Sequence, residues 1–442
     1  MKAIIHPARA VALGFLLTIL FGTALLALPM ARAGGAPAPL FTAFFTSVSA
    51  VCVTGMVTVD TGTYWSTFGQ SVIMLLFQMG GFGMMTAATL LGLMVNRSPR
   101  LRARMMTQTE TRTLALGDVA SIARVVLVVT LVAQTLIAAV LMLRLRYRYD
   151  LNWQEAAWSG LFHAVSAFNN AGFSIHADGL MRYAGDALIL LPIMLGFIVG
   201  GIGFPVLHDL RQRRSDARRW SLHTKLTLSG TAVLLLGGFL AVLFFEWDNA
   251  HTLGPFGMAD KALNSLFISA AARTSGFNTV DIGALHHETW ALHYFLMFIG
   301  GGSASTAGGV KVATVVVLFL LVLAEVRGQS DTEAYGRRVG ASAQRQAITV
   351  LVLGSVLVVS GTVILLRLTD FPTDQVIFEV IAAFSTAGLS TGITAQLPVS
   401  GQLVLLVLMF FGRVGTITLA TSLVLGERRM PFRYPEEHPI VG

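Results

Sequence analysis

The sequence predicts an all-α integral membrane protein in which four pseudo-repeated units surround one central pore. Each unit is a transmembrane span, a short pore helix and a second span. Of the 442 residues, 54% are hydrophobic and only 12% are charged. A chain with so little charge exposes its surface mainly to lipid. Eight apolar runs and a motif that recurs four times supply the rest of the prediction.

The apolar runs approach or exceed the ~20 residues that a helix needs to cross the hydrocarbon core. They are residues 10–31, 68–95, 119–143, 185–207, 226–247, 290–324, 347–368 and 399–424. We therefore expect eight transmembrane helices. The first run ends in Pro29-Met30-Ala31-Arg32-Ala33, which resembles a signal-peptide cleavage site. We favour a retained helix, because the run is longer than a usual signal core and the repeat needs it.

The basic residues predict the topology. With the N-terminus inside, the cytoplasmic segments would be residues 1–9, 96–118, 208–225, 325–346 and 425–442, and these hold 20 of the 31 Lys and Arg residues. The positive-inside rule therefore places both termini in the cytoplasm, in a multi-pass protein of the cell (cytoplasmic) membrane. Membrane topology also accounts for the net charge of +8 without a nucleic-acid-binding face. Arg144, Arg146 and Arg148 run against the rule, in a predicted short outer loop.

Four similar segments define the repeat. They are FTSVSAVCVTGMVT (45–58), FHAVSAFNNAGFSI (162–175), LFISAAARTSGFNT (266–279) and FEVIAAFSTAGLST (378–391). Each has an Ala five residues before a Gly and a large apolar residue directly after that Gly. The glycines are Gly55, Gly172, Gly276 and Gly388, at spacings of 117, 104 and 112 residues. The predicted units are residues 1–96, 119–207, 226–324 and 347–424, followed by a cytoplasmic tail, 425–442.

The short helix before each Gly cannot cross a bilayer, so we expect it to be re-entrant. Non-helical backbone at that depth is tolerated only where protein buries it or where it lines a water-filled cavity. Four such loops can converge on one axis. Gly permits close backbone approach, and four loops of inward carbonyls can replace the hydration shell of a monovalent cation.

The predicted filter for a monovalent cation contains no carboxylate. Its residues are Val53, Thr54, Gly55, Asn170, Ala171, Gly172, Thr274, Ser275, Gly276, Thr386, Ala387 and Gly388. The alternative is that these small residues serve only close helix packing. Arg273 stands next to the third loop, and we expect it to anchor that loop from behind rather than to act in the pore.

The stretch GGSASTAGGVK interrupts the run 290–324 and predicts an intramembrane gate. The gate residues are Gly301, Gly302, Ser303, Ala304, Ser305, Thr306, Ala307, Gly308, Gly309 and Lys311, together with Arg413. The other second spans carry glycine breaks of their own, at Gly80-Gly81, Gly200-Gly201 and Gly412. Nucleotide binding by this stretch is disfavoured, since Val310 separates Gly309 from Lys311 and no strand precedes it.

Two basic residues fall inside predicted spans, where a charge is costly and calls for a partner or a function. Arg413 would be either a positive barrier just inside the filter or a hydrogen-bond donor that holds the loop closed. Lys311 would tune the same cavity or simply reach water from a helix end.

The chain resembles the Trk/Ktr/HKT superfamily, and most closely its KtrB-type potassium-translocating subunits. The resemblance rests on SVSAVCVTGMVTVDT (47–61), AFNNAGFS (167–174), RTSGFNTVD (273–281), GGSASTAGGVKVAT (301–314) and GRVGTITLATSL (412–423). It implies potassium uptake, with Gly at all four filter positions accompanying potassium selectivity. A sodium-selective or sodium/potassium-coupled member of the same superfamily remains an alternative.

The same resemblance implies partners. KtrB-type subunits are homodimers on a cytoplasmic ring of KtrA-type regulatory subunits, so adenine nucleotide would be bound by the partner and not by this chain. The basic segments 97–112 and 208–225 are the candidate docking surfaces.

The sequence disfavours two other classes of function. A secondary transporter of a small solute would usually show two inverted repeats rather than four units in one direction. An enzyme would need a nucleophile and a base, and the sequence offers no such set. His163, in the second pore helix, is interpreted as a packing residue rather than a proton relay.

Overall fold

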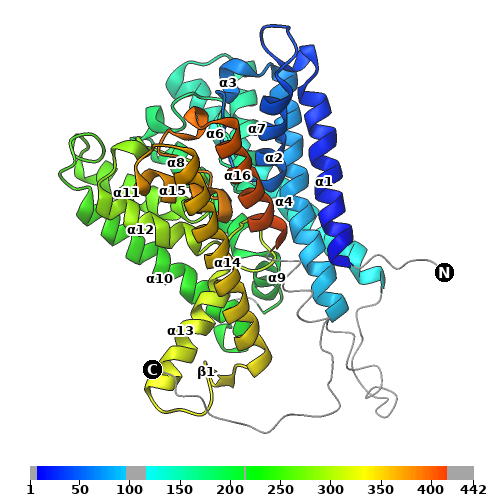
Figure 1. Ribbon diagram of the computed structural model, residues 1–442, viewed down its shortest axis with the longest axis vertical. Helices are drawn as coiled ribbons and strands as arrows, with labels where there is room; N and C mark the ends of the chain where they lie inside the picture. Colours follow the sequence, from blue (N-terminus) through cyan, green and yellow to red (C-terminus); the bar gives the residue numbers. More distant parts are fainter. Residues whose placement is uncertain (1–6, 96–115, 214–215, 416–442) are drawn as a thin grey trace.

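The computed structural model describes residues 7–95, 116–213 and 216–415, and their regular secondary structure is helical apart from one small hairpin (Figure 1). The N-terminal half contains α1 (Pro7–Leu26), α2 (Leu40–Cys52), α3 (Thr61–Tyr64), α4 (Thr67–Val95), α6 (Leu116–Tyr149), α7 (Trp153–Phe168), α8 (Ala187–Ile202) and α9 (Phe204–Arg213). The C-terminal half contains α10 (Leu222–Phe245), α11 (Met258–Ala272), α12 (His287–Phe298), α13 (Val312–Val326), α14 (Ala341–Leu368), α15 (Thr373–Ser385) and α16 (Val399–Phe410). Single 3₁₀ turns cover Pro29–Ala31, Met181–Tyr183, Ala217–Arg219, Ile282–Ala284 and Thr394–Gln396.

The hairpin joins α13 to α14. Strand β1 (Glu333–Ala334) pairs antiparallel with β2 (Arg337–Arg338), with Glu333 opposite Arg338. The hairpin and the adjoining ends of α13 and α14 lie at one end of the molecule, and α3 lies at the other (Figure 1). The predicted cytoplasmic segment 325–346 is therefore far from the segment that follows the first pore helix.

Three described helices are long and apolar enough to cross a membrane by themselves: Val126–Tyr149 within α6, α10 and α14. A fourth candidate is the pair formed by α8 and α9, which is bent by 94°. The helices α1, α13 and α16 are apolar but shorter. An arrangement of eight spans therefore remains a prediction for this chain.

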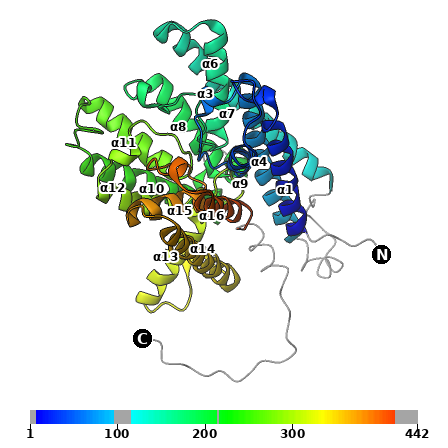
Figure 2. The same cartoon turned by 45° about the horizontal axis from the view of Figure 1, so that its top comes forward.

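Four short helices, α2, α7, α11 and α15, occupy the positions predicted for pore helices. The first, α2, packs against α1 and α4, and each of the other three packs against the helix before it and the helix after it in the sequence. Contacts between successive groups close a ring, because α4 packs on α7, α8 on α11, α12 on α15, and α16 on α2. Figure 2 shows α15 and α16 in the middle of the molecule, with α1 and α4 on one side and α10 and α12 on the other.

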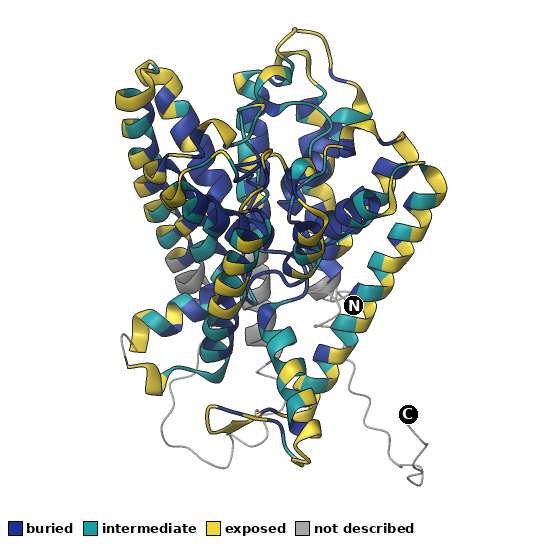
Figure 3. Ribbon diagram, turned by 90° about the vertical axis from the view of Figure 1, so that its left-hand side faces the viewer, coloured by how far each residue is buried: buried dark blue, intermediate teal, exposed yellow. Residues whose placement is uncertain are grey.

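Local sequence explains where these short helices begin. The side chain of Asn152 accepts a hydrogen bond from the backbone N–H of Glu155 and caps α7. Pro39 and Pro372 precede α2 and α15, where their fixed φ and missing N–H cost nothing. The apolar residues of the pore helices are then buried by the longer helices around them (Figure 3).

The outer surface is apolar. Large exposed side chains lie along the long helices, and Phe244 on α10 is 79% exposed. An exposed apolar surface of this kind suits lipid rather than water.

Two expectations drawn from the sequence were wrong. The glycine pairs at 80–81 and 200–201 do not break their helices, since α4 and α8 continue through them. A Cβ on Gly80 would overlap the carbonyl oxygen of Val51, so that glycine allows α4 to approach the first pore helix closely. The break in the second unit comes later, at Gly203, whose φ is +101°.

The predicted outer loop around Arg144, Arg146 and Arg148 is also helical, because α6 extends to Tyr149. Arg144 Nε forms a 2.8 Å ion pair with Asp186 at the start of α8. Since that partner neutralises the charge, a basic residue can be retained near the end of an apolar helix.

Candidate functional site

The four predicted filter loops lie against one another. Each follows the C-terminal end of one of α2, α7, α11 and α15, where the helix dipole is negative. A Cβ placed on Gly172 would lie 2.8 Å from the Cα of Gly276, and one placed on Gly276 would lie 3.3 Å from the Cα of Gly388. The loops are therefore in van der Waals contact across a common centre.

The same contact recurs around this centre. In each case the glycine of one loop packs against the carbonyl oxygen of the residue that precedes the glycine in the next loop. The four pairs are Gly55 with Ala171, Gly172 with Ser275, Gly276 with Ala387 and Gly388 with Thr54. At all four positions a Cβ would come within 3.0 Å of that oxygen, so a side chain larger than hydrogen would displace the neighbouring loop.

The backbone of the loops explains the need for glycine. All four glycines have positive φ, between 68° and 87°. The residue two positions earlier is also left-handed in three loops, at Val53, Asn170 and Thr386. The third loop differs, because Thr274 is not left-handed. A left-handed conformation is costly for β-branched Val53 and Thr386 and persists only where surrounding structure imposes it.

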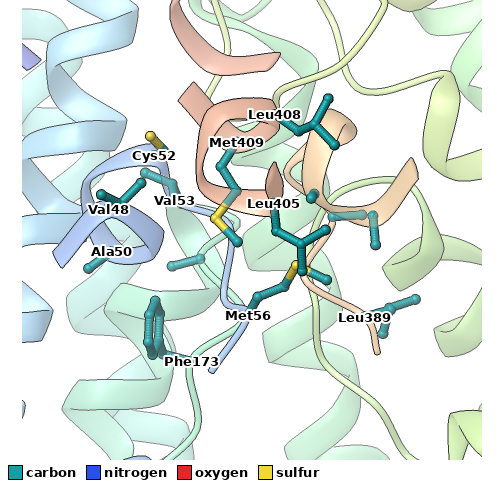
Figure 4. Close-up of a cluster of buried hydrophobic side chains, with 14 of the residues drawn as sticks. Val48, Ala50, Cys52, Val53, Met56, Phe173, Leu389, Leu405, Leu408 and Met409 are labelled. Atoms are coloured by element: carbon teal, nitrogen blue, oxygen red, sulfur yellow. The ribbon is translucent and has the colours of Figure 1, made fainter. Parts of the chain in front are cut away.

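The large apolar residue after each glycine anchors the loops. These residues are Met56, Phe173, Phe277 and Leu389, and each is at most 2% exposed. Figure 4 shows Met56 beside Leu405 and Met409 of α16, with Cys52 and Val53 of the first unit nearby. The loops are thus held from behind by the hydrophobic core, while their backbone faces the centre.

A cavity of about 220 Å³ adjoins the four glycines, all of which line it. Asp60, Asp281, His176 and Asn278 line it too. The carboxylates of Asp60 and Asp281 accept backbone N–H bonds from Thr63 and Gly283, which fixes their position. A polar, partly acidic cavity next to the loops can receive a hydrated cation.

Two buried carboxylates were not predicted from the sequence. Glu379 on α15 is fully buried and accepts hydrogen bonds from Ser390, Thr391 and Thr394, which follow the fourth loop. Glu246, directly after α10, is also fully buried and accepts hydrogen bonds from Asn249, Thr252 and His286. The signal was present, since an acidic residue in an apolar segment calls for partners.

His163 occupies in α7 the repeat position that Glu379 occupies in α15. Its ring nitrogens lie 2.8 Å from the carbonyl oxygen of Ser159 and 3.0 Å from the hydroxyl of Ser174. Both side chains thus fasten the segment that follows a filter glycine to its own pore helix. This geometry suits the packing role predicted for His163.

The predicted gate segment connects α12 to α13 and lies against the end of α8. The backbone N–H groups of Gly302 and Thr306 donate to the carbonyl oxygens of Gly201 and Gly200. A Cβ on Gly301 or Gly302 would overlap the backbone of residues 201–202. The segment is therefore folded against the end of α8, and its glycines permit this close backbone contact.

Two basic side chains donate to carbonyl oxygens of this segment, and a third donates to Gly300, directly before it. Arg413, fully buried in the π-helical turn Phe411–Gly415, donates to the carbonyl oxygen of Thr306. Lys311 donates to the carbonyl oxygens of Ala307 and Gly308 at 2.6 and 3.1 Å. Arg273 donates to the carbonyl oxygen of Gly300 at 3.2 Å, behind the third loop.

These contacts bear on the roles expected from the sequence. The position of Arg413 suits a donor that holds the loop closed, and its second bond, of 3.4 Å, reaches the carbonyl oxygen of Gly80. Arg273 donates to Thr231 Oγ1 and to the carbonyl oxygen of Gly300, and its role as an anchor of the third loop stays a prediction. Lys311 binds carbonyl oxygens of the loop itself rather than reaching water from a helix end.

In the candidate docking surface 208–225, apart from residues 214–215, which are not described, α9 is bonded to the start of α10. Asp209 on α9 accepts from Ser221 N and Thr224 Oγ1 at 2.8 and 2.6 Å and pairs with Arg213. Burial alone would raise the pKa of Asp209, but the bonds from Thr224 and Ser221 and the Arg213 guanidinium outweigh it and lower that pKa below its usual value. The other candidate surface, 97–112, and the tail 425–442 lie outside the described residues.

Comparison with known proteins gives consistent matches over nearly the whole sequence. The pattern of the TrkH family, described as a cation transport protein, matches residues 10–430. The chain is 38% identical to the Ktr system potassium uptake protein B of Bacillus subtilis, over 99% of this chain and 97% of that protein. It is 33% identical to the potassium/sodium uptake protein NtpJ of Enterococcus hirae, over 99% and 98% of the two chains.

A solved structure shares the fold. The potassium transporter TrkH from Vibrio parahaemolyticus superposes with a TM-score of 0.72 at 20% sequence identity, covering 97% of this chain and 86% of that one.

Proposed function

Since the chain belongs to the TrkH family of cation transport proteins, we propose that it takes up potassium ions across the cytoplasmic membrane through a carbonyl-lined filter. Its membrane character follows from the family and from its apolar helices. It is a KtrB-type member of the Trk/Ktr superfamily and a transport protein rather than an enzyme.

One observation carries the proposal. The glycine of each loop packs against a carbonyl oxygen of the next, and this contact is repeated four times around one centre. Oxygen atoms that ring a centre in this way can replace the water around a monovalent ion at little cost, because the loops are already in place. The filter is formed by the twelve residues predicted from the sequence, and a hydrated ion approaches it through the cavity beside Asp60 and Asp281.

The same proposal extends to the architecture. Four units, residues 1–96, 119–207, 226–324 and 347–424, surround the pore and contribute eight spans, with both termini in the cytoplasm. The ring of contacts that α4, α8, α12 and α16 make with the next pore helix supports this arrangement.

The gate is the segment 301–311. It lies beside the filter, and Arg413, Lys311 and Arg273 bind its carbonyl oxygens or that of Gly300. Small residues without bulky side chains can move aside, and breaking the bond from Arg413 to Thr306 releases the segment.

Partners follow from the relatives. The protein of Bacillus subtilis is named as a component of a Ktr system, which implies a second subunit. We infer a homodimer on a cytoplasmic ring of KtrA-type subunits, which bind the nucleotide and bias the gate.

The main alternative is transport or coupling of sodium, which is favoured by one relative named a potassium/sodium uptake protein. Uptake of potassium, rubidium and sodium into proteoliposomes containing the purified chain separates the two. Potassium uptake that persists without sodium supports the proposal. Flux of sodium alone would overturn it, and solute-coupled transport without ion selectivity would favour a secondary transporter.

A further inference from the structure

The inner end of the filter is a ring of mostly polar side chains. The residues two positions before the four glycines are Val53, Asn170, Thr274 and Thr386, each at most 4% exposed. The gate segment, together with Gly300 directly before it, packs on the three polar ones. The Nδ2 of Asn170 donates to Thr306 Oγ1 at 2.6 Å. A Cβ on Gly300 would lie 3.5 Å from Thr274 Cγ2, and one on Gly308 would overlap the Thr386 hydroxyl.

Asn170 uses both ends of its side-chain amide. While Nδ2 donates to Thr306 in the gate, Oδ1 accepts from the hydroxyl of Thr274 in the third loop, at 3.2 Å. Asn170 belongs to the second loop, where its φ is +57°. Asn tolerates this conformation better than most residues do. One buried side chain therefore joins two filter loops and the gate segment.

We propose that Asn170 is a positioning residue that couples the gate to ion preference at the inner end of the filter. The inference rests on the proposed function and names a regulation of the same site. When the gate segment leaves, Thr306 leaves with it and the buried Nδ2 loses its acceptor. A buried unpaired donor is unfavourable, so the amide reorients toward another acceptor. Because Oδ1 turns with Nδ2, the bond that fixes Thr274 changes at the same time.

Coupling of this kind acts in both directions. An ion that stabilises the present arrangement of Asn170 and Thr274 favours the closed gate, and one that stabilises the reoriented amide favours the open gate. The gate then controls which ion is preferred as well as how fast ions pass.

The test is Thr306→Val, which keeps the shape of the side chain but removes the acceptor, with Thr306→Ser as the conservative rescue. The readouts are the ratio of potassium to rubidium and sodium flux in proteoliposomes and the potassium concentration at half-maximal flux. We expect T306V to change the ratio of potassium flux to rubidium or sodium flux by about fivefold or more, the lower end of measured couplings between sites. T306S should resemble the wild type.

Ser305→Ala supplies a matched comparison. Ser305 donates to the carbonyl oxygen of Gly302 at 2.7 Å, a bond within the gate segment that does not reach the filter. We expect S305A to change the rate of flux and to leave ion preference as it is.

A second variant decides the matter if T306V does not fold. Asn170→Asp keeps an acceptor for Thr274, tolerates the left-handed backbone and removes the donor to Thr306. It should reproduce the change in ion preference, and adding T306V to it should change little more. Altered total flux with unchanged ion ratios in T306V or N170D would overturn the coupling while leaving the proposed function intact. Absence of potassium flux in the wild type would instead overturn the proposed function.

Discussion

Replacing Arg413 with Gln should open the gate. Arg413 is fully buried and donates to the carbonyl oxygen of Thr306, with a second, longer bond of 3.4 Å to Gly80. A hydrogen bond from a charged donor contributes about 1.5–3 kcal/mol. Because the second bond is long, we assign this value to the bond with Thr306 alone. At 1.36 kcal/mol per factor of ten, the balance between open and closed gate shifts roughly 10- to 150-fold toward open.

The assay is potassium flux into proteoliposomes that contain the purified chain without regulatory subunits. Flux should rise in R413Q up to the limit set by full opening, and Arg413→Lys should give a smaller increase because it keeps the charge. Thermal unfolding of the purified variants checks that they remain folded. Unchanged or reduced flux in a folded R413Q protein would refute the assignment of Arg413 as the donor that holds the gate closed.

Four further predictions follow from the same structure. Gly55→Ser should lower the preference for potassium over sodium in a flux assay, because any side chain there overlaps a carbonyl oxygen of the next loop; unchanged preference would exclude that loop from the filter. Deleting residues 303–308 should raise flux and reduce its dependence on the regulatory ring, whereas lower flux in folded protein would make the segment structural. Gly412→Ala should lower the melting temperature, since its Cβ would overlap a carbonyl oxygen of α15, while Gly237→Ala, with nothing within 4 Å, should not. Asp209→Asn should destabilise the protein above the unfolded pKa of about 3.9, and the difference from wild type should vanish as pH falls through the lowered folded pKa; a difference that persists at low pH would contradict this linkage.

The sequence allowed the four loops to be predicted because their constraint is local. Gly55, Gly172, Gly276 and Gly388 all require positive φ, and each is followed by a large apolar residue that is buried behind the loop. In each unit the glycine follows an alanine of the pore helix by five residues. A fixed spacing of this kind can be recognised even when other positions vary.

Long-range contacts could not be predicted in the same way. Gly80 and Gly81 were expected to break a helix, but α4 continues through them and uses them to approach its neighbours. Composition cannot separate a glycine that breaks a helix from one that allows close packing. The bond between Asn170 and Thr306 joins residues 136 positions apart, and no repeat pattern encodes such a pair.

The sequence showed which charged residues need a partner, but not which residues those partners are. A buried Arg413 called for acceptors, but the sequence could not identify the carbonyl oxygen of Thr306 as one of them. The sequence predicted a loop at Arg144. In the structure α6 continues through Arg144, whose side chain pairs with Asp186.

The central claim is that ions bind among the four loops, and structure determination of the purified protein with thallium tests it most directly. The account predicts thallium signal on the axis between Gly55, Gly172, Gly276 and Gly388, and loss of that signal when excess potassium replaces thallium. Thallium bound elsewhere, with none between these glycines, would contradict it.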